Sequence, residues 1–159
     1  TGYLLGTLAS RFRQVIAVDP ADGMLAVARD RPEVRAATNI EFRLGSLAEL
    51  PLADGEADLA IASLVLHHVA RPADALAELA RCLQPAGRLL IVEQETHSHV
   101  EFHERMGDLW WGFEPTVLET QVKAAGFADV VSRRLASAGP QNNRVGGAPA
   151  LFVLTARKQ

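Results

Sequence analysis

Cysteine is almost absent from this chain of 159 residues, which contains Cys82 alone. A single cysteine cannot form an internal disulfide, so the chain is not a disulfide-stabilised secreted domain, and a reducing cytoplasm is the expected location. Long apolar runs are absent too, and none approaches the ~20 residues that a membrane-spanning helix requires. We therefore expect a cytoplasmic protein with no membrane span.

Positive charge is not in excess either. Sixteen Lys and Arg residues stand against nineteen Asp and Glu residues, which gives a formal net charge of −3. Without a basic patch, the segment is not expected to bind nucleic acid through its phosphates. What the chain does have is 48% hydrophobic and 22% charged residues, the composition of a globular protein of about one domain, residues 1–159.

The most informative stretch is VIAVD, residues 15–19. A short, β-branched apolar run that ends in turn residues is typical of a strand buried on both faces of a parallel α/β sheet. Asp19 then lies at the carboxyl end of the strand, where α/β proteins bind ligands and where an acid accepts hydrogen bonds from both ribose hydroxyls. The alternative is that Asp19 only caps the helix that starts near Gly23.

Strand and helix patterns alternate along the rest of the first two thirds of the chain, which predicts βαβ units. Pro32 is expected to stop the second helix. The predicted helices are 4–13, 24–31 and 72–83, and the further predicted strands are 40–44, 59–63 and 88–93.

The pattern changes after Glu93. A helix is predicted over 116–125, closed by Gly126 in the left-handed conformation. Strands at 129–135 and 150–156 flank a loop rich in Gly, Asn and Pro, and they are expected to pair antiparallel.

Residues 94–113 hold three of the five histidines without a clean period. On a strand His97, His99 and Glu101 would share a face, whereas on a helix His99 and His103 would. No spacing supplies three ligands without first choosing a conformation, so no metal site is predicted.

Both tryptophans lie in the same stretch. Trp110, Trp111 and Phe113 form an aromatic group. Such a group suits a lid or wall for an apolar substrate, part of the core, or a subunit contact.

In this order, the segments resemble a class I methyltransferase that uses S-adenosylmethionine. IAVDPADGML resembles the family's ribose-binding stretch, and LQPAGRLLIVEQE its turn from a helix into the fifth strand. The segments LPLADGEAD, LVLHHV and RCLQPAGRLLI are similar to those of ubiquinone and menaquinone methyltransferases. Within that group, residues 97–127 resemble methyltransferases fused to, or encoded with, winged-helix regulators related to arsenic sensors.

The resemblance implies a Rossmann-like fold, mainly parallel, with an antiparallel last strand. The family's first strand and most of its glycine-rich loop have no counterpart in residues 1–159, so we expect the carboxyl-terminal part of a longer polypeptide. That strand is central in the family's sheet, and its neighbours would lose ladder partners without it. Residues 1–159 alone are therefore expected to bind the cofactor poorly.

The resemblance also implies which residues bind S-adenosyl-L-methionine. Gly2 would approach the methionine part, Asp19 the ribose and Pro20 the adenine. Ser46 stands where the family often has an acid for the adenine amino group, and Ala86 replaces a usual glycine. The implied cofactor-binding residues are Thr1, Gly2, Asp19, Pro20, Met24, Ser46, Leu47 and Ser63.

The implied activity is in-line methyl transfer to a small molecule. The sulfonium already activates the methyl group, so orientation is the main task and a general base is optional. His67 and His68 follow the fourth strand, where one of them could face substrate or both could cap or pack the next helix; His97 is a further candidate. The alternatives are an effector-sensing domain of a winged-helix regulator, without turnover, and a nicotinamide dehydrogenase. The methyl acceptor, a homodimer and an upstream DNA-binding domain are left open.

Overall fold

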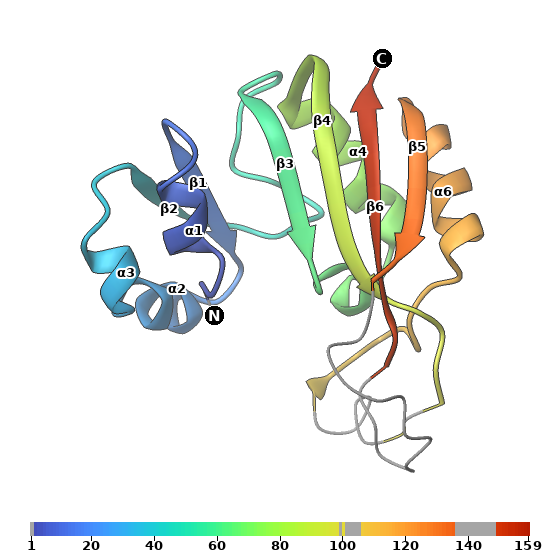
Figure 1. Cartoon of the computed structure of the whole chain (residues 1–159), viewed down its shortest axis with the longest axis horizontal. Helices are drawn as coiled ribbons and strands as arrows, with labels where there is room; N and C mark the ends of the chain where they lie inside the picture. The colour runs from blue at the N-terminus through green and yellow to red at the C-terminus, as the bar shows by residue number, and fades with distance from the viewer. Residues whose placement is uncertain (1, 99, 101–105, 136–148) are drawn as a thin grey trace. The chain divides into compact units, whose positions relative to one another are not determined.

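The structure is a computed structural model that describes residues 2–98, 100, 106–135 and 149–159 (Figure 1). The chain divides into two compact units, Thr1–Pro51 and Leu52–Gln159. None of the helices in the described ranges is long and apolar enough to cross a bilayer.

The first unit contains a two-stranded parallel sheet with three helices. The strands pair with Val15 opposite Ile40 and with Asp19 opposite Leu44, and helix α2 contacts both strands. The elements are α1 (Leu5–Ala9), β1 (Val15–Asp19), α2 (Asp22–Arg29), α3 (Pro32–Arg35) and β2 (Ile40–Leu44).

Two expectations for this unit were wrong, and a third was confirmed. Strand β1 is half-buried, not buried on both faces, because among the described residues it pairs along one edge only, with β2. Helix α1 ends at Ala9 rather than near Arg13, since none of its residues is buried and packing does not extend it. Pro32 does follow the end of α2, but it also begins α3, where its fixed φ suits the first helical turn.

The second unit contains a four-stranded sheet in the order β3-β4-β6-β5. Strand β4 is parallel to β3, and β6 is antiparallel to both of its neighbours, β4 and β5. The predicted antiparallel last strand and the pairing of the last two strands are thus confirmed. The strands are β3 (Ala57–Ser63), β4 (Leu83–Gln94), β5 (Phe127–Arg134) and β6 (Leu151–Lys158).

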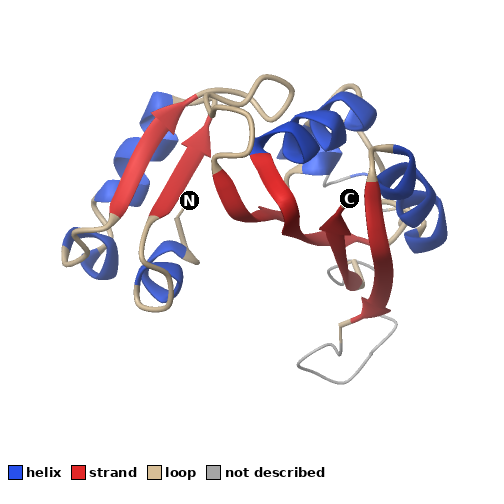
Figure 2. Cartoon of the chain, turned by 90° about the horizontal axis from the view of Figure 1, so that it is seen from above, coloured by secondary structure: helices blue, strands red, loops and turns tan. Residues whose placement is uncertain are grey.

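Two α-helices of this unit, α4 (Pro72–Cys82) and α6 (Pro115–Ala124), cover one face of the sheet, and a 3₁₀ turn, η1 (Leu66–His68), precedes α4. Both views show α4 and α6 on the same face, and the two helices contact each other (Figures 1 and 2). Between the helices and the sheet lies an apolar core in which the largest fully buried side chains include Leu76, Ile91, Leu118, Phe127 and Phe152. Gly126 ends α6 with a φ of +96°, as predicted.

The predicted break between α4 and the next strand lies inside the range of β4. Ala86 has a φ of +63°, a left-handed conformation that glycine adopts more easily. A Cβ on Gly87 would come within 2.8 Å of the Gln84 carbonyl oxygen. The register of β4 against β3 shifts between Leu83 and Arg88 because the turn interrupts the ladder. Ala86 therefore does support the turn, at the cost of strain.

Cys82 is buried at the end of α4, and burial raises the pKa of its thiol. The thiolate is the reactive form, so a raised pKa and poor access both slow its chemistry. We expect an aromatic disulfide reagent at pH 8 to react with Cys82 slowly in the folded chain and rapidly in urea, measured by stopped-flow absorbance. Because the chain has a single cysteine, the signal has one source. Full reaction of the folded chain within the mixing time would contradict this placement.

Candidate functional site

The carboxyl ends of β1 and β2 place Asp19 beside the turn that contains Ser46. The Gly45 N–H donates to the Asp19 backbone carbonyl at 3.2 Å. The Asp19 side chain accepts a hydrogen bond from the Ala21 N–H at 2.9 Å, through Oδ1. Helix α2 has Ala21 as its N-cap and no side-chain capping bond. Asp19 therefore holds the turn before the helix and does not cap it, and Oδ2 has no partner within the part of the chain that the structure describes.

The other predicted cofactor residues of the first unit lie near these strand ends or on its surface. Ser46 is exposed and forms an isolated bridge with Glu49. Leu47 is half-buried, whereas Pro20 and Met24 are exposed. Asp19 and the turn at Ser46 are thus brought together.

Gly2 has a packing reason to be glycine. Its φ is +68°, and a Cβ would lie 2.6 Å from the Cβ of Ala28 on α2. Thr1 is outside the described residues. The predicted role of Gly2 beside the cofactor stays a prediction.

The carboxyl ends of β3 and β4 carry the functional residues of the second unit. Ser63 is half-buried and pairs with Val92. Leu64 follows with a φ of +54°, and its N–H donates to the Val92 carbonyl at 2.8 Å. A branched aliphatic residue in the left-handed region is strained, and such strain is common at functional turns.

Glu93 holds this turn from inside the core. Its carboxylate is fully buried, and Oε1 accepts hydrogen bonds from the N–H groups of Val65 at 3.0 Å and Leu66 at 2.8 Å. Oε2 lies 2.8 Å from His67 Nδ1 and also accepts from the Gln94 N–H at 3.0 Å. Four donors around one carboxylate make Glu93 the centre of the turn. The sequence shows Glu93 as an acid at a strand end, but its partners come from the neighbouring strand end.

His67 is buried against Glu93. Burial lowers the pKa of His67, but the hydrogen bond that its ring donates to Glu93 and the charges of Glu93 and Asp108 outweigh burial and raise this pKa above the ordinary value. The histidine pair does not cap the next helix, since α4 has Arg71 as its N-cap and no side-chain capping bond; the alternative, packing, agrees with the contact between η1 and α4.

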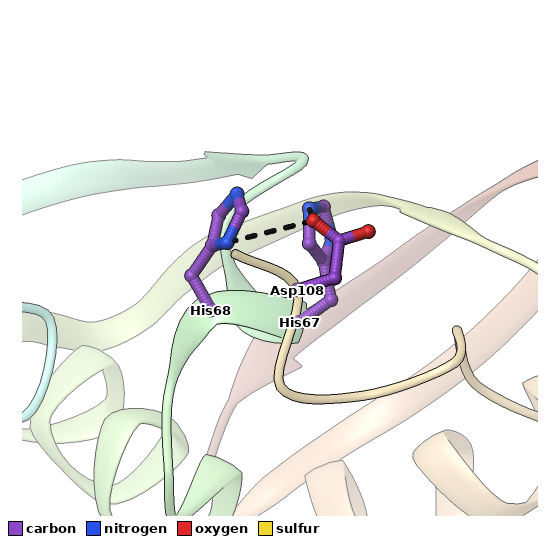
Figure 3. A group of neighbouring side chains, drawn as sticks. All are labelled: His67, His68 and Asp108. Atoms are coloured by element: carbon purple, nitrogen blue, oxygen red, sulfur yellow. Dashed lines mark ion pairs between the residues drawn. The ribbon is translucent and has the colours of Figure 1, made fainter. Parts of the chain in front are cut away.

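His68 and Asp108 complete the cluster, which we call the His–Asp cluster (His67, His68 and Asp108). Asp108 Oδ1 lies 3.8 Å from His67 Nε2 and 3.7 Å from His68 Nδ1. Figure 3 shows the Asp108 carboxylate beside the two imidazole rings. Asp108 is 2% exposed, whereas the His68 side chain is 43% exposed. Sequence reasoning missed Asp108 because nothing local links it to a histidine pair 40 positions earlier.

Backbone hydrogen bonds hold the segment 107–113 against η1 and the end of β4. The N–H groups of Leu109 and Trp110 donate to the His67 carbonyl at 2.8 Å and 3.1 Å, and the Phe113 N–H donates to the Gln94 carbonyl at 2.9 Å. Phe113 is buried, as one of the alternatives for the aromatic group expected. Trp110 and Trp111 keep 42% and 38% of their surface exposed.

His97 does not join the His–Asp cluster. Its ring lies edge-on to Trp111, with the ring centroids 6.2 Å apart. His99, Glu101 and His103 fall outside the described residues.

A comparison with protein families now gives these features a context. The sequence model described as "Methyltransferase domain" matches residues 1–91, which is more than half of the chain. The chain belongs to this family of S-adenosylmethionine-dependent methyltransferases. The matched residues include Asp19, at the carboxyl end of β1, and the histidine pair that follows β3.

Curated relatives are similar over part of their length. An uncharacterised 37.1 kDa protein of transposon TN4556 from Streptomyces fradiae is 45% identical over 100 residues, which are 61% of this chain and 28% of that protein. The ubiquinone/menaquinone biosynthesis C-methyltransferase UbiE of Methylobacterium nodulans is 42% identical over 87 residues, which are 55% of this chain and 33% of that protein. The chain thus spans about a third of the length of these relatives.

Solved structures show the same fold. The N-methyltransferase NodS from Bradyrhizobium japonicum WM9, in complex with S-adenosylhomocysteine, superposes with a TM-score of 0.75 at 14% identity, over 99% of this chain and 72% of that one. This likeness confirms the Rossmann-like methyltransferase fold that the resemblance implied.

Proposed function

We propose that this chain binds S-adenosyl-L-methionine and transfers its methyl group in line to a small molecule. The observation that carries the proposal is the carboxylate of Asp19 at the end of β1. Oδ1 accepts a hydrogen bond from the Ala21 N–H. Oδ2 accepts none from the residues that the structure describes, so it can accept one from a ligand hydroxyl. This is the position at which an acid in an α/β sheet accepts hydrogen bonds from a ribose.

The residues of the first unit fit an adenosine group. Asp19 supplies the acceptor for the ribose, and the adjacent turn at Ser46 and Leu47 supplies a polar edge and an apolar contact for the base. The exposed Pro20 offers it a flat apolar surface. Bound S-adenosylmethionine would supply a methyl group already activated by a positive sulfur, so the chain has to orient it and exclude water.

The residues of the second unit suit an apolar acceptor. Leu64 and Val65 are exposed beside η1. Trp110 is also partly exposed, and its backbone N–H donates to the His67 carbonyl in η1. Large apolar side chains left in contact with water around one turn favour a substrate with an apolar ring or chain. The chain is similar to UbiE, a C-methyltransferase named for ubiquinone and menaquinone biosynthesis. We therefore choose aromatic rings as the first acceptors to test.

The test is a pair of measurements on the longest encoded polypeptide that contains these residues, because the relatives are longer than the chain. Calorimetry with S-adenosylhomocysteine should show one site, and NADH under the same conditions should show none. Radiolabelled methyl transfer from S-adenosylmethionine to a panel of hydroxylated aromatic rings should then identify an acceptor. Absence of S-adenosylhomocysteine binding would refute the proposal, and binding without transfer to any acceptor would favour an effector-sensing domain instead.

A further inference from the structure

Asp108 is a buried carboxylate that accepts no hydrogen bond from the part of the chain that the structure describes. The nearest ring nitrogens, at 3.7 Å and 3.8 Å, are too distant for hydrogen bonds. A buried carboxylate without a hydrogen bond is unfavourable unless positive charge lies close to it. Among the described residues, the rings of His67 and His68 are the groups that face Asp108, and a cation held between the three side chains would balance its charge.

The hydrogen bond to Glu93 determines which nitrogen of His67 faces Asp108. Glu93 accepts two backbone N–H groups at Oε1 and one at Oε2, and a proton on Nδ1 of His67 makes the 2.8 Å contact a further hydrogen bond donated to Oε2. Nε2 of the neutral ring then presents a lone pair toward the Asp108 oxygen, and two acceptors face each other. Metal-binding histidines have this arrangement, in which the other ring nitrogen donates to a carboxylate.

His68 approaches the same point from the surface. Its Nδ1 has one further polar contact, the Gly107 carbonyl oxygen at 3.3 Å, which is long for a hydrogen bond. Its ring is partly exposed. One ligand atom from each member of the His–Asp cluster lies within 4.8 Å of the others.

We propose that His67 Nε2, His68 Nδ1 and the Asp108 carboxylate bind one divalent transition-metal ion. Two imidazoles and a carboxylate, with no thiolate, suit Zn²⁺ or Co²⁺. Three protein ligands leave a coordination position for water or for an oxygen of another molecule. The backbone bonds from Leu109 and Trp110 to the His67 carbonyl hold Asp108 in place, and Glu93 orients His67.

The site is tested with metal-free protein, prepared by chelation and dialysis of the whole chain. Titration with Co²⁺, followed by its visible d–d absorption, should reach saturation at one ion per chain, and Zn²⁺ should displace it. His68→Ala and Asp108→Asn should each weaken Co²⁺ binding at least tenfold. Asp74→Asn is the matched control, because Asp74 is a partly exposed carboxylate of the same unit that pairs with Arg71; its affinity should be unchanged.

Thermal unfolding gives a second measurement. Zn²⁺ should raise the melting temperature of the wild type, with an increase that grows as the logarithm of the Zn²⁺ concentration above the dissociation constant, and it should not raise that of Asp108→Asn. The exposure of His68 makes His68→Ala informative even if the Asp108 variant fails to fold. Absence of saturable Co²⁺ binding, or equal binding by His68→Ala and the wild type, would overturn the proposal. Nitrogen NMR gives a further check. If His67 is protonated on both nitrogens and added metal does not change its signals, an imidazolium neutralises Asp108 and the proposal is overturned.

Discussion

Replacing Glu93 by glutamine is expected to lower the free energy of unfolding by about 3–5 kcal/mol, the range for removing one partner from a buried charged pair. The reason is the number of donors that meet this one carboxylate. Oε1 accepts from Val65 and Leu66, and Oε2 contacts His67 and Gln94. A glutamine has one acceptor oxygen, so its amide N–H₂ faces either the N–H groups of Val65 and Leu66 or the N–H of Gln94, and at least one buried backbone donor is left unsatisfied whichever way the amide is turned.

Urea unfolding followed by far-UV circular dichroism measures this effect. Glu114→Gln provides the control, because Glu114 is exposed and makes no side-chain capping bond at the start of α6. The control should change stability by no more than about 0.5 kcal/mol. If Glu93→Gln unfolds at the same urea concentration as the control, the hydrogen bonds around Glu93 do not hold the turn.

Replacing Asp19 by asparagine is expected to weaken S-adenosylhomocysteine binding by roughly 10- to 100-fold, since a hydrogen bond to a charged group contributes about 1.5–3 kcal/mol. The substitution removes an acceptor for the ligand and keeps the hydrogen bond that holds the turn. The amide oxygen can still accept the Ala21 N–H, whereas the amide nitrogen that replaces Oδ2 is a donor and cannot accept from a ribose hydroxyl.

Calorimetry of the same polypeptide with Asp22→Asn supplies the comparison. Asp22 is an exposed carboxylate in the first turn of α2, close in sequence to Asp19. Its substitution removes the same charge without removing an acceptor at the strand end, so the affinity should stay within about twofold after correction for screening. Equal affinities for the Asp19 and Asp22 variants would show that Asp19 does not bind the ribose.

Local sequence pattern was sufficient for most elements of the fold. The apolar run at 15–19 and the alternation at 40–44 match β1 and β2 residue for residue, because strand patterns with turn residues on both sides leave little freedom in the bounds. The predicted helices 72–83 and 116–125 match α4 and α6 to within one residue at each end.

Degree of burial was harder to predict than element type. Strands β1 and β3 have the composition of fully buried strands, yet most of their residues are half-buried. Burial depends on which strands and helices lie alongside, and a single sequence says little about neighbours that are distant along the chain. The predicted length of α1 was wrong for a related reason, since helices this short depend on tertiary packing.

The sequence by itself determined the strand and helix order, the acid at the end of β1 and the histidine pair after β3, because these follow from short-range periodicity and turn chemistry. Only the tertiary structure decided what those histidines contact. Glu93 meets His67 because parallel strands end at one edge, and Asp108 reaches the same edge through backbone bonds of a segment without a regular period. Contacts of that kind join positions 26 to 43 residues apart, and no local pattern encodes them.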